Sequence, residues 1–327
     1  MRALFFDGTL KQIEDVPLPR LAPDEVLIRT RSAGICNTDL ELIRGMYGFC
    51  GVPGHEFCGE VVDGPQSLLG KRVAGEINIS CGECRMCRPG MTSQCLARRT
   101  MGIHDYPGVF ADFLRLPLRN LHIVPEGVSD EAAVFTEPLA AALQVTEAVH
   151  IRPGTPVLVI GAGKLGLLIA QVLHLTGAVV SVVVRHEKQT RLLRGWGITA
   201  LRVDELESQY FPVVVEVSGA ASGLETALRL VRSRGTVVLK STFHGKPQVD
   251  MTQVAVREIA IVGSRCGPFA PAIQLLEQGL VDVNSLIEGS YALQDGLQAF
   301  ERAALPGTLK ILFRFSRNDT DPAAVGA

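Results

Sequence analysis

The chain has 327 residues, of which 47% are hydrophobic and 20% are charged, and its formal net charge is −2. A chain of this length and composition buries a large core and favours two domains, and because it has no long run of Lys or Arg nothing indicates a surface for nucleic acid or anionic membranes. The N-terminal stretch carries acidic residues and lacks a long apolar core, and no later apolar run reaches about 18 residues. We therefore expect a cytoplasmic protein with no membrane segment and with small-molecule partners.

The first part of the chain, up to about residue 140, has the pattern of an all-β unit. Short strand-like runs such as EVLIRTRS at 25–32 and RVAGEI at 72–77 alternate with Gly and Pro turns. Such spacing of short strands and turns is typical of a sandwich or barrel.

The pattern changes near residue 150, where apolar strand runs begin to alternate with helical stretches. Nearly continuous apolar strands between amphipathic helices indicate a parallel sheet covered on both faces, so we predict a doubly wound domain. One more helix and one more strand follow it. The predicted strands are 156–160, 179–184, 212–217, 235–240, 259–264 and 309–315, and the predicted helices are 165–175, 223–231, 270–279 and 293–305.

Four of the eight cysteines lie close together in a lobe at residues 81–95. They are Cys81, Cys84, Cys87 and Cys95. The spacing C-x2-C-x2-C-x7-C lets four thiolates converge on one tetrahedral ion, and a zinc bound in this way is structural because no coordination position stays open. An iron–sulfur cluster and four unbound thiols are the alternatives, although the fourth cysteine comes late for a ferredoxin-type run.

Three separate stretches supply ligands for a second, open metal site. GICNTDLE contains Cys36, GVPGHEFCGE contains His55 and Glu56, and VFTEPLAAAL contains Glu137. Alone, each residue has a simpler explanation, such as a buried thiol, a hydrogen-bonded histidine or a glutamate that opens a helix. Together, one thiolate, one imidazole and the carboxylates could hold a zinc ion that keeps a position for a substrate oxygen.

The glycine-rich segment VLVIGAGKLGLL predicts a dinucleotide site. Gly161, Gly163 and Gly166 follow an apolar strand and open a helix, and Lys164 and Leu165 lie at the start of that helix. Glycines in this context allow a tight turn and a close approach of a pyrophosphate to the helix N-terminus.

The combined order of these motifs resembles the zinc-dependent medium-chain dehydrogenases, which include alcohol, sorbitol and threonine dehydrogenases. The similarity runs over nearly the whole chain. It implies a GroES-like β-barrel catalytic domain at 1–145 and 286–327 and a Rossmann domain at 146–285, with the active site in the cleft between them. It also implies a homodimer or homotetramer.

The resemblance assigns roles to the candidate residues. His55 would be oriented by Asp39, Glu56 would exchange with water, and Thr38 would contact the substrate alcohol and carry its proton away. Zinc would act as a Lewis acid while a hydride passes to nicotinamide C4. The implied ligands of this catalytic zinc are Cys36, His55, Glu56 and Glu137.

The choice between NADP and NAD depends on the end of the second Rossmann strand. An NAD enzyme places an acid there, whereas this chain has Val184 at that position, with Arg185 and His186 after it. Because a guanidinium pairs with a 2′-phosphate, we predict NADP, with Arg191 as a second contact. The alternative is an NAD site in which Glu187 binds the ribose. Further predicted coenzyme contacts are Ser218, Gly219, Ser264 and Arg265.

We therefore expect a two-zinc oxidoreductase that transfers a hydride between NADP and an alcohol, polyol or matching carbonyl compound. Two alternatives stay open at this point. A zinc-independent NADPH reductase of the same superfamily would lack the Cys, His and Glu set, and a non-enzymatic NAD(P)H-binding protein would show no turnover.

Overall fold

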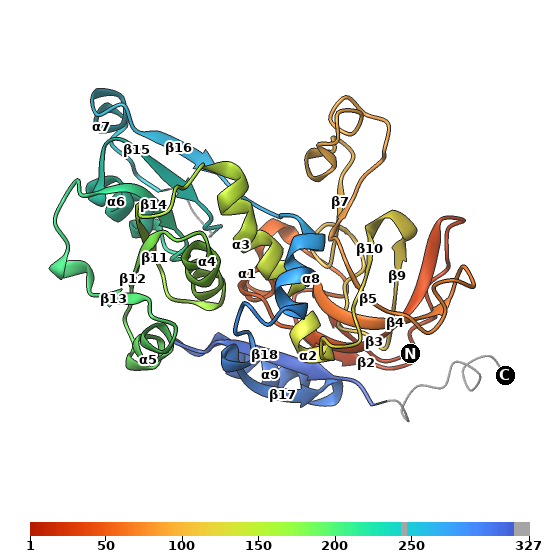
Figure 1. Ribbon diagram of the computed structural model, residues 1–327. Helices are drawn as coiled ribbons and strands as arrows, with labels where there is room; N and C mark the ends of the chain where they lie inside the picture. The colour runs from red at the N-terminus through yellow and green to blue at the C-terminus, as the bar shows by residue number, and fades with distance from the viewer. Residues whose placement is uncertain (243–246, 317–327) are drawn as a thin grey trace. The chain divides into compact units, whose positions relative to one another are not determined.

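The computed structural model describes residues 1–242 and 247–316, and they divide into two compact units (Figure 1). One unit contains residues 1–137 together with the segment from Phe269 onward, and the other contains residues 138–268. The chain passes from the first unit to the second within one helix, α3 (Thr136–Ala148).

The first unit is built around a largely antiparallel sheet. Within the described residues its strands follow the order β10-β5-β4-β3-β18-β17, with β9 also paired to β3. β3 pairs with β4, β9 and β18, and most of its residues from Val26 to Gly34 are buried. The strands of this sheet are β3 (Glu25–Gly34), β4 (Glu56–Asp63), β5 (Arg72–Gly75), β9 (Phe113–Pro117), β10 (Leu121–Ile123), β17 (Ile287–Ala292) and β18 (Lys310–Arg314).

Two smaller sheets and several helices complete this unit. The segment that contains β7 extends from the unit as a loop, drawn in orange in Figure 1. The remaining strands are β1 (Ala3–Phe6), β2 (Leu10–Ile13), β6 (Asn78–Ile79), β7 (Arg99–Met101) and β8 (Asp105–Tyr106). The helices are α1 (Asn37–Ile43), α2 (Asp130–Ala133), α8 (Phe269–Glu277) and α9 (Gly296–Ala304).

The second unit contains the predicted doubly wound parallel sheet, which the structure confirms. Among the described residues its strand order is β13-β12-β11-β14-β15-β16, and every neighbouring pair is parallel. Leu224 and Leu228 pack with Leu158 and Val214 in the core of this unit. The strands are β11 (Pro156–Ile160), β12 (Val179–Val183), β13 (Thr199–Leu201), β14 (Phe211–Glu216), β15 (Val231–Leu239) and β16 (Ala260–Gly263), and the helices are α4 (Lys164–Leu175), α5 (Glu187–Gly195), α6 (Ala221–Leu230) and α7 (Met251–Val256).

The two compact units meet at 137/138 and at 268/269, and the domain division at 145/146 and 285/286 stays a prediction. The segment that begins at Phe269 belongs to the first unit, because the Phe269 ring stacks on His122 at a centroid distance of 5.2 Å. Leu276 packs against a buried cluster that includes Val124 and Val128. These apolar contacts bind α8 to the antiparallel unit. Residues 317–327 of the predicted C-terminal segment lie outside the described residues.

Candidate active site and coenzyme-binding edge

Asp39 fixes the position of Cys36 at the start of α1. Cys36 has an extended backbone and forms the N-cap of the helix, and its N–H donates to Asp39 Oδ2 at 2.8 Å. The other oxygen, Oδ1, accepts the Gly54 N–H at 3.2 Å and lies 3.2 Å from Nδ1 of His55, although that contact lacks the alignment of a hydrogen bond. The Asp39 side chain is fully buried. One carboxylate therefore holds together the two chain segments that carry Cys36 and His55.

Strand pairing brings Glu56 and Lys310 to the same place. Gly34, the last residue of β3, is paired with Glu56 on one side and with Leu312 of β18 on the other. The Lys310 ammonium contacts Glu56 Oε2, and both side chains are 1% exposed. A Cβ atom on Gly34 would lie 2.6 Å from that carboxylate oxygen and 3.2 Å from Cδ of Lys310. The glycine thus leaves the space that this buried ion pair fills.

Cys36, His55 and Glu56 form a group whose ligand atoms lie within 4.8 Å of one another. Burial by itself would lower the pKa of His55, but the Asp39 carboxylate and Cys36 raise it well above its ordinary value. Burial would also lower the pKa of Lys310, but Glu56 and then Cys36 raise it. The surroundings therefore favour positive charge. Thiolate, imidazole and carboxylate donors in such surroundings fit a zinc ion.

The structure brings Thr38 to this group but does not include Glu137 in it. Thr38 Oγ1 lies 3.8 Å from Cys36 Sγ. Glu137 is half-buried in the first turn of α3 and is not one of the three residues whose ligand atoms meet the 4.8 Å limit.

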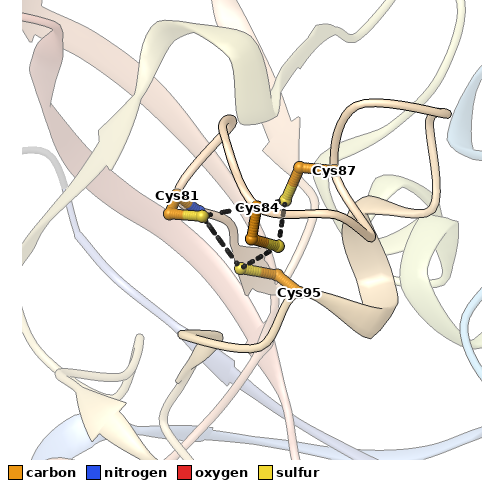
Figure 2. Close-up of side chains that lie close together, drawn as sticks. All are labelled: Cys81, Cys84, Cys87 and Cys95. Carbon is orange, nitrogen blue, oxygen red and sulfur yellow. Dashed lines mark hydrogen bonds between the residues drawn. The ribbon is translucent and has the colours of Figure 1, made fainter.

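The four cysteines of the lobe surround a common point, as Figure 2 shows. The Sγ–Sγ distances are 3.5 Å for Cys81–Cys95 and Cys84–Cys87, 3.9 Å for Cys84–Cys95 and 4.0 Å for Cys81–Cys87. Tetrahedral zinc thiolates place their sulfurs about 3.8 Å apart, whereas a disulfide needs about 2 Å. The arrangement fits a closed four-sulfur zinc site.

Backbone amides favour thiolates in this lobe. The N–H of Leu96, followed by those of Cys87 and Met86, lowers the pKa of Cys84 to about 6 against the opposing effect of burial. The Cys81 N–H donates to Cys95 Sγ at 3.3 Å and lowers the pKa of that thiol as well. Because the thiolate is the form that binds zinc, these amides prepare Cys84 and Cys95 for a metal, whereas burial, followed by the neighbouring thiols, raises the pKa of Cys87 to about 12 in the metal-free lobe.

The glycine-rich loop has the geometry that a dinucleotide requires. Gly161 follows β11 with φ +119°, and a Cβ there would lie 2.7 Å from Val217 O. A Cβ on Gly166 would lie 1.8 Å from Gly161 O, whereas one on Gly163, the N-cap of α4, would meet no atom within 4 Å. Gly161 and Gly166 are therefore required by packing. Gly163 leaves open space where a pyrophosphate can approach the helix N-terminus.

The end of β12 carries exposed basic residues. The strand ends at Val183, Val184 follows it, and Arg185 and His186 are exposed before α5 begins at Glu187. Arg191 is exposed one turn into the helix. The side chain directly after the strand, Val184, is thus apolar, and the first acid, Glu187, comes three residues later.

The remaining predicted coenzyme residues follow β14 and β16. Ser218 donates through its backbone N–H and its hydroxyl to Glu216 Oε1, at 2.9 and 2.6 Å. The Gly219 N–H donates to Ser241 Oγ at 2.8 Å, and the Ser264 N–H donates to Leu239 O at 3.1 Å. The carboxyl ends of parallel strands meet at one edge of a sheet, which is where ligands bind in this class of fold. Arg265, which like Ser264 follows β16, is exposed.

Comparison with known proteins agrees with both units. The model of the alcohol dehydrogenase GroES-like domain matches residues 22–126, and that of the zinc-binding dehydrogenase domain matches residues 165–278. L-threonine 3-dehydrogenase of Chelativorans sp. (strain BNC1) is 31% identical, over 88% of this chain and 90% of that protein. The chain belongs to the zinc-dependent medium-chain dehydrogenases.

Solved structures of this family extend the comparison. A protein of Sinorhizobium meliloti 1021, determined with NADP bound, has a TM-score of 0.86 and 28% identity, with 96% of this chain and 99% of that chain covered. Acetophenone reductase of Geotrichum candidum NBRC 4597, determined in complex with NAD, has a TM-score of 0.88 and 26% identity, with 98% of each chain covered. The predicted GroES-like and Rossmann fold is thereby confirmed. The dehydrogenase is an NAD(P)-dependent oxidoreductase that acts on alcohols or the matching carbonyl compounds.

None of the helices in its described part has both the length and the apolar character needed to span a bilayer.

Two lysines of the dehydrogenase that line these regions were missed by the sequence analysis. Lys310 contacts Glu56, and Lys240, directly after β15, is buried beside Ser264. Lys310 lies within the mainly apolar strand run LKILFRF, and Lys240 ends the run GTVVLK. A lysine at such a position is a signal, because a buried ammonium needs partners.

Proposed function

We propose that the dehydrogenase oxidises alcohols or polyols, or reduces the matching carbonyl compounds, with NADP as its coenzyme and with one catalytic and one structural zinc ion per chain. The observation that carries this proposal is the meeting of Cys36, His55 and Glu56 beside buried Lys310. A thiolate at the N-cap of α1 and an imidazole and a carboxylate at the start of β4 form a donor set that a zinc-independent reductase or a non-enzymatic binder does not need.

The roles of the side chains follow from their surroundings. Cys36, His55 and Glu56 would hold the catalytic zinc, and Lys310 would balance the charge of Glu56. When bound, zinc supplies Lewis-acid stabilisation of negative charge on the substrate oxygen. Thr38, whose Oγ1 is 3.8 Å from Cys36 Sγ, would take the hydroxyl proton of the alcohol and release its own hydroxyl proton toward solvent, and a bound nicotinamide would supply the acceptor for the hydride. A carbonyl product results.

Glu137 remains our fourth proposed ligand of the catalytic zinc. It lies in the first turn of α3 and is half-buried. With zinc bound, the Glu137 carboxylate would move to the ion and become its fourth protein ligand, because carboxylates bind zinc readily.

The preference for NADP is supported by the residues that follow β12. Val184 offers no acceptor for ribose hydroxyls, and Arg185 and His186 are exposed next to it. A guanidinium pairs with a 2′-phosphate through two parallel hydrogen bonds. Arg191 would add a second positive charge on the first turns of α5.

We also propose a cytoplasmic homodimer or homotetramer, on the resemblance to the family.

The deciding experiment measures zinc per chain and turnover in the wild type and in Cys36→Ser. We expect two zinc ions in the dialysed wild type, one in the variant, and loss of alcohol oxidation with unchanged affinity for NADPH. Cys50→Ser is the matched control, since Cys50 is exposed and lies outside both metal groups. Unchanged turnover in Cys36→Ser would favour the zinc-independent reductase, and NADPH binding without turnover on a broad panel of alcohols and aldehydes would favour the non-enzymatic binder.

A further inference from the structure

The carboxyl ends of β11 and β14 lie side by side, and the glycine loop rests on the segment that follows β14. The two strands pair in parallel with Ile160 opposite Glu216, and the Val217 N–H donates to Ile160 O at 3.0 Å. A Cβ atom on Gly161 would lie 2.7 Å from Val217 O. Residues 217–220, which we call the β14 turn, therefore form a wall of the glycine loop.

The glycine loop, the β14 turn and the start of α4 are packed without room for adjustment. A Cβ atom on Gly166 would lie 1.8 Å from Gly161 O and 3.2 Å from a methyl carbon of Val217. One on Gly161 would lie 2.8 Å from Ser218 Cα. In an interior packed this closely, a displacement of one backbone is passed to the next. The place where a pyrophosphate would meet α4 thus depends on where the β14 turn is held.

A single carboxylate holds the β14 turn. Glu216 is the last residue of β14 and is fully buried. Its Oε1 accepts the Ser218 N–H at 2.9 Å and the Ser218 hydroxyl at 2.6 Å. Ser218 Oγ in turn accepts the Ala220 N–H at 3.2 Å. The Ser218 hydroxyl therefore serves the shape of the turn itself.

The first turn of α6 leaves space for this carboxylate. A Cβ atom on Gly223 would lie 2.2 Å from Glu216 Oε1 and equally close to Ser218 Oγ. The N-cap of the helix, Ala220, makes no side-chain capping bond, and the N–H groups of a helix end favour a negative charge beside them. The position of the Glu216 carboxylate is thus set from two sides, by β14 and by α6.

This acid is unfavourable for stability alone. Oε2 of Glu216 has no hydrogen-bond partner within the part of the chain that the structure describes. A buried carboxylate oxygen without a partner costs free energy, and the three residues before it in β14 are all valines. An acid at the end of this apolar strand is therefore explained by what its other oxygen holds, which is the turn beside the glycine loop.

We propose that Glu216 is a positioning residue for the coenzyme, which it does not touch but whose binding loop it holds in place through Ser218. The inference rests on the proposed coenzyme site at this edge of the sheet. Because Glu216 acts on the shape of the site, its effect is the same for oxidised and reduced coenzyme. It acts on binding rather than on hydride transfer, so the KM for coenzyme depends on Glu216 far more than kcat does.

The test is the dissociation constants of NADPH and NADH, measured by calorimetry on the zinc-loaded wild type, Glu216→Ala and Glu216→Gln. We expect Glu216→Ala to weaken whichever coenzyme the wild type prefers by about tenfold, because both bonds to Ser218 are lost. In Glu216→Gln the amide oxygen can accept the same two bonds, so affinity should stay within about twofold even where thermal unfolding shows lower stability. Glu225→Ala is the control, because Glu225 is exposed on α6, and it should leave both constants unchanged.

Two further measurements separate positioning from a merely structural role. Steady-state rates at saturating alcohol should give a raised KM for the coenzyme in Glu216→Ala, with kcat within about twofold of the wild type. Ser218→Ala removes the hydroxyl and keeps the N–H, so we expect it to lower the affinity by about threefold. Combined with Glu216→Ala, it should lose less than the product of the two single effects, because both act through one turn.

Several results would overturn the inference. One is a folded Glu216→Ala variant that binds coenzyme as tightly as the wild type. Another is a Glu216→Gln variant that loses as much affinity as Glu216→Ala, since the two bonds to Ser218 would then not be what matters. Should Glu216→Ala not fold, unchanged affinity in Ser218→Ala decides against the inference. A wild type that binds neither NADPH nor NADH refutes the proposed function itself, and the inference with it.

Discussion

The Oδ1 atom of Asp39 lies 3.2 Å from Nδ1 of His55, and both side chains are buried. The same carboxylate accepts the N–H groups of Cys36 and Gly54, so a single acid positions both the thiolate and the imidazole of the candidate metal site. Groups that support metal ligands in this way determine how well the ligands are prearranged for the ion.

We expect Asp39→Asn to lower the affinity of the catalytic zinc by at least about tenfold, because the amide brings no negative charge and cannot serve the same three partners. Competition with a chelator of known affinity measures this. Glu41→Gln is the control, because Glu41 lies on the same helix but pairs with exposed Arg44. Equal zinc affinities in the two variants would show that Asp39 does not support the site.

Lys310→Met should destabilise the fold by about 3–5 kcal/mol, since it leaves the Glu56 carboxylate buried without its cation. The double variant Glu56→Gln with Lys310→Met should recover part of the loss. Urea unfolding at a buffered concentration of free zinc gives the four free energies of the cycle. Additive effects would contradict a coupled pair.

Cys87→Ser should remove one zinc ion per chain and leave the catalytic ion in place, because it takes away one of four sulfurs in a closed site. Metal analysis before and after dialysis counts the ions, and limited proteolysis reports whether residues 81–95 have loosened. Two retained zinc ions in this variant would argue against a four-sulfur site.

Arg185→Ala should weaken NADPH binding by about tenfold with little effect on NADH, because only the 2′-phosphate pairs with the guanidinium. Glu187→Gln tests the alternative, in which the first residue of α5 binds the ribose of NAD. If Glu187→Gln weakens NADH and Arg185→Ala changes neither affinity, the preference for NADP is wrong.

Two glycines of the coenzyme loop should respond differently to alanine. Gly166→Ala forces a methyl group against Gly161 O and should destabilise the coenzyme-free protein by about 1–3 kcal/mol. Gly163→Ala meets no protein atom within 4 Å, so stability should hold while the affinity for NADPH falls. Thermal unfolding and NADPH titration of both variants separate the effects. A loss of stability in Gly163→Ala would contradict the open space at this position.

The parts of the fold and site that could be predicted are those whose geometry is set by a short stretch of sequence. The four cysteines of the lobe are within fifteen residues, and the glycine loop is a single strand–turn–helix passage, so their spacing alone carries the geometry. Parallel strands such as β11 and β14 are buried on both faces and read as continuous apolar runs. The structure confirms the doubly wound sheet for this reason.

Long-range partners could not be predicted in the same way. Lys310 and Glu56 are 254 positions apart, and only the pairing of β18 and β4 with β3 brings them together. The unit to which α8 belongs depends on the stacking of Phe269 on His122, which no sequence period indicates. Glu137 has the right residue type for a metal ligand, but where its carboxylate lies depends on the path of α3, which its local sequence does not define.

The contact between Glu56 and Lys310 also bears on how the protein is made. A ribosome adds about 5–20 residues each second, so Glu56 leaves the exit tunnel many seconds before residue 310 is synthesised. Until β18 arrives, the edge of β3 that it covers is open, and the carboxylate faces water or other chains. The nascent dehydrogenase therefore passes through a long interval in which β3 and β4 have been made but the first unit cannot close; the second unit, which ends at residue 268, is itself completed only shortly before β18.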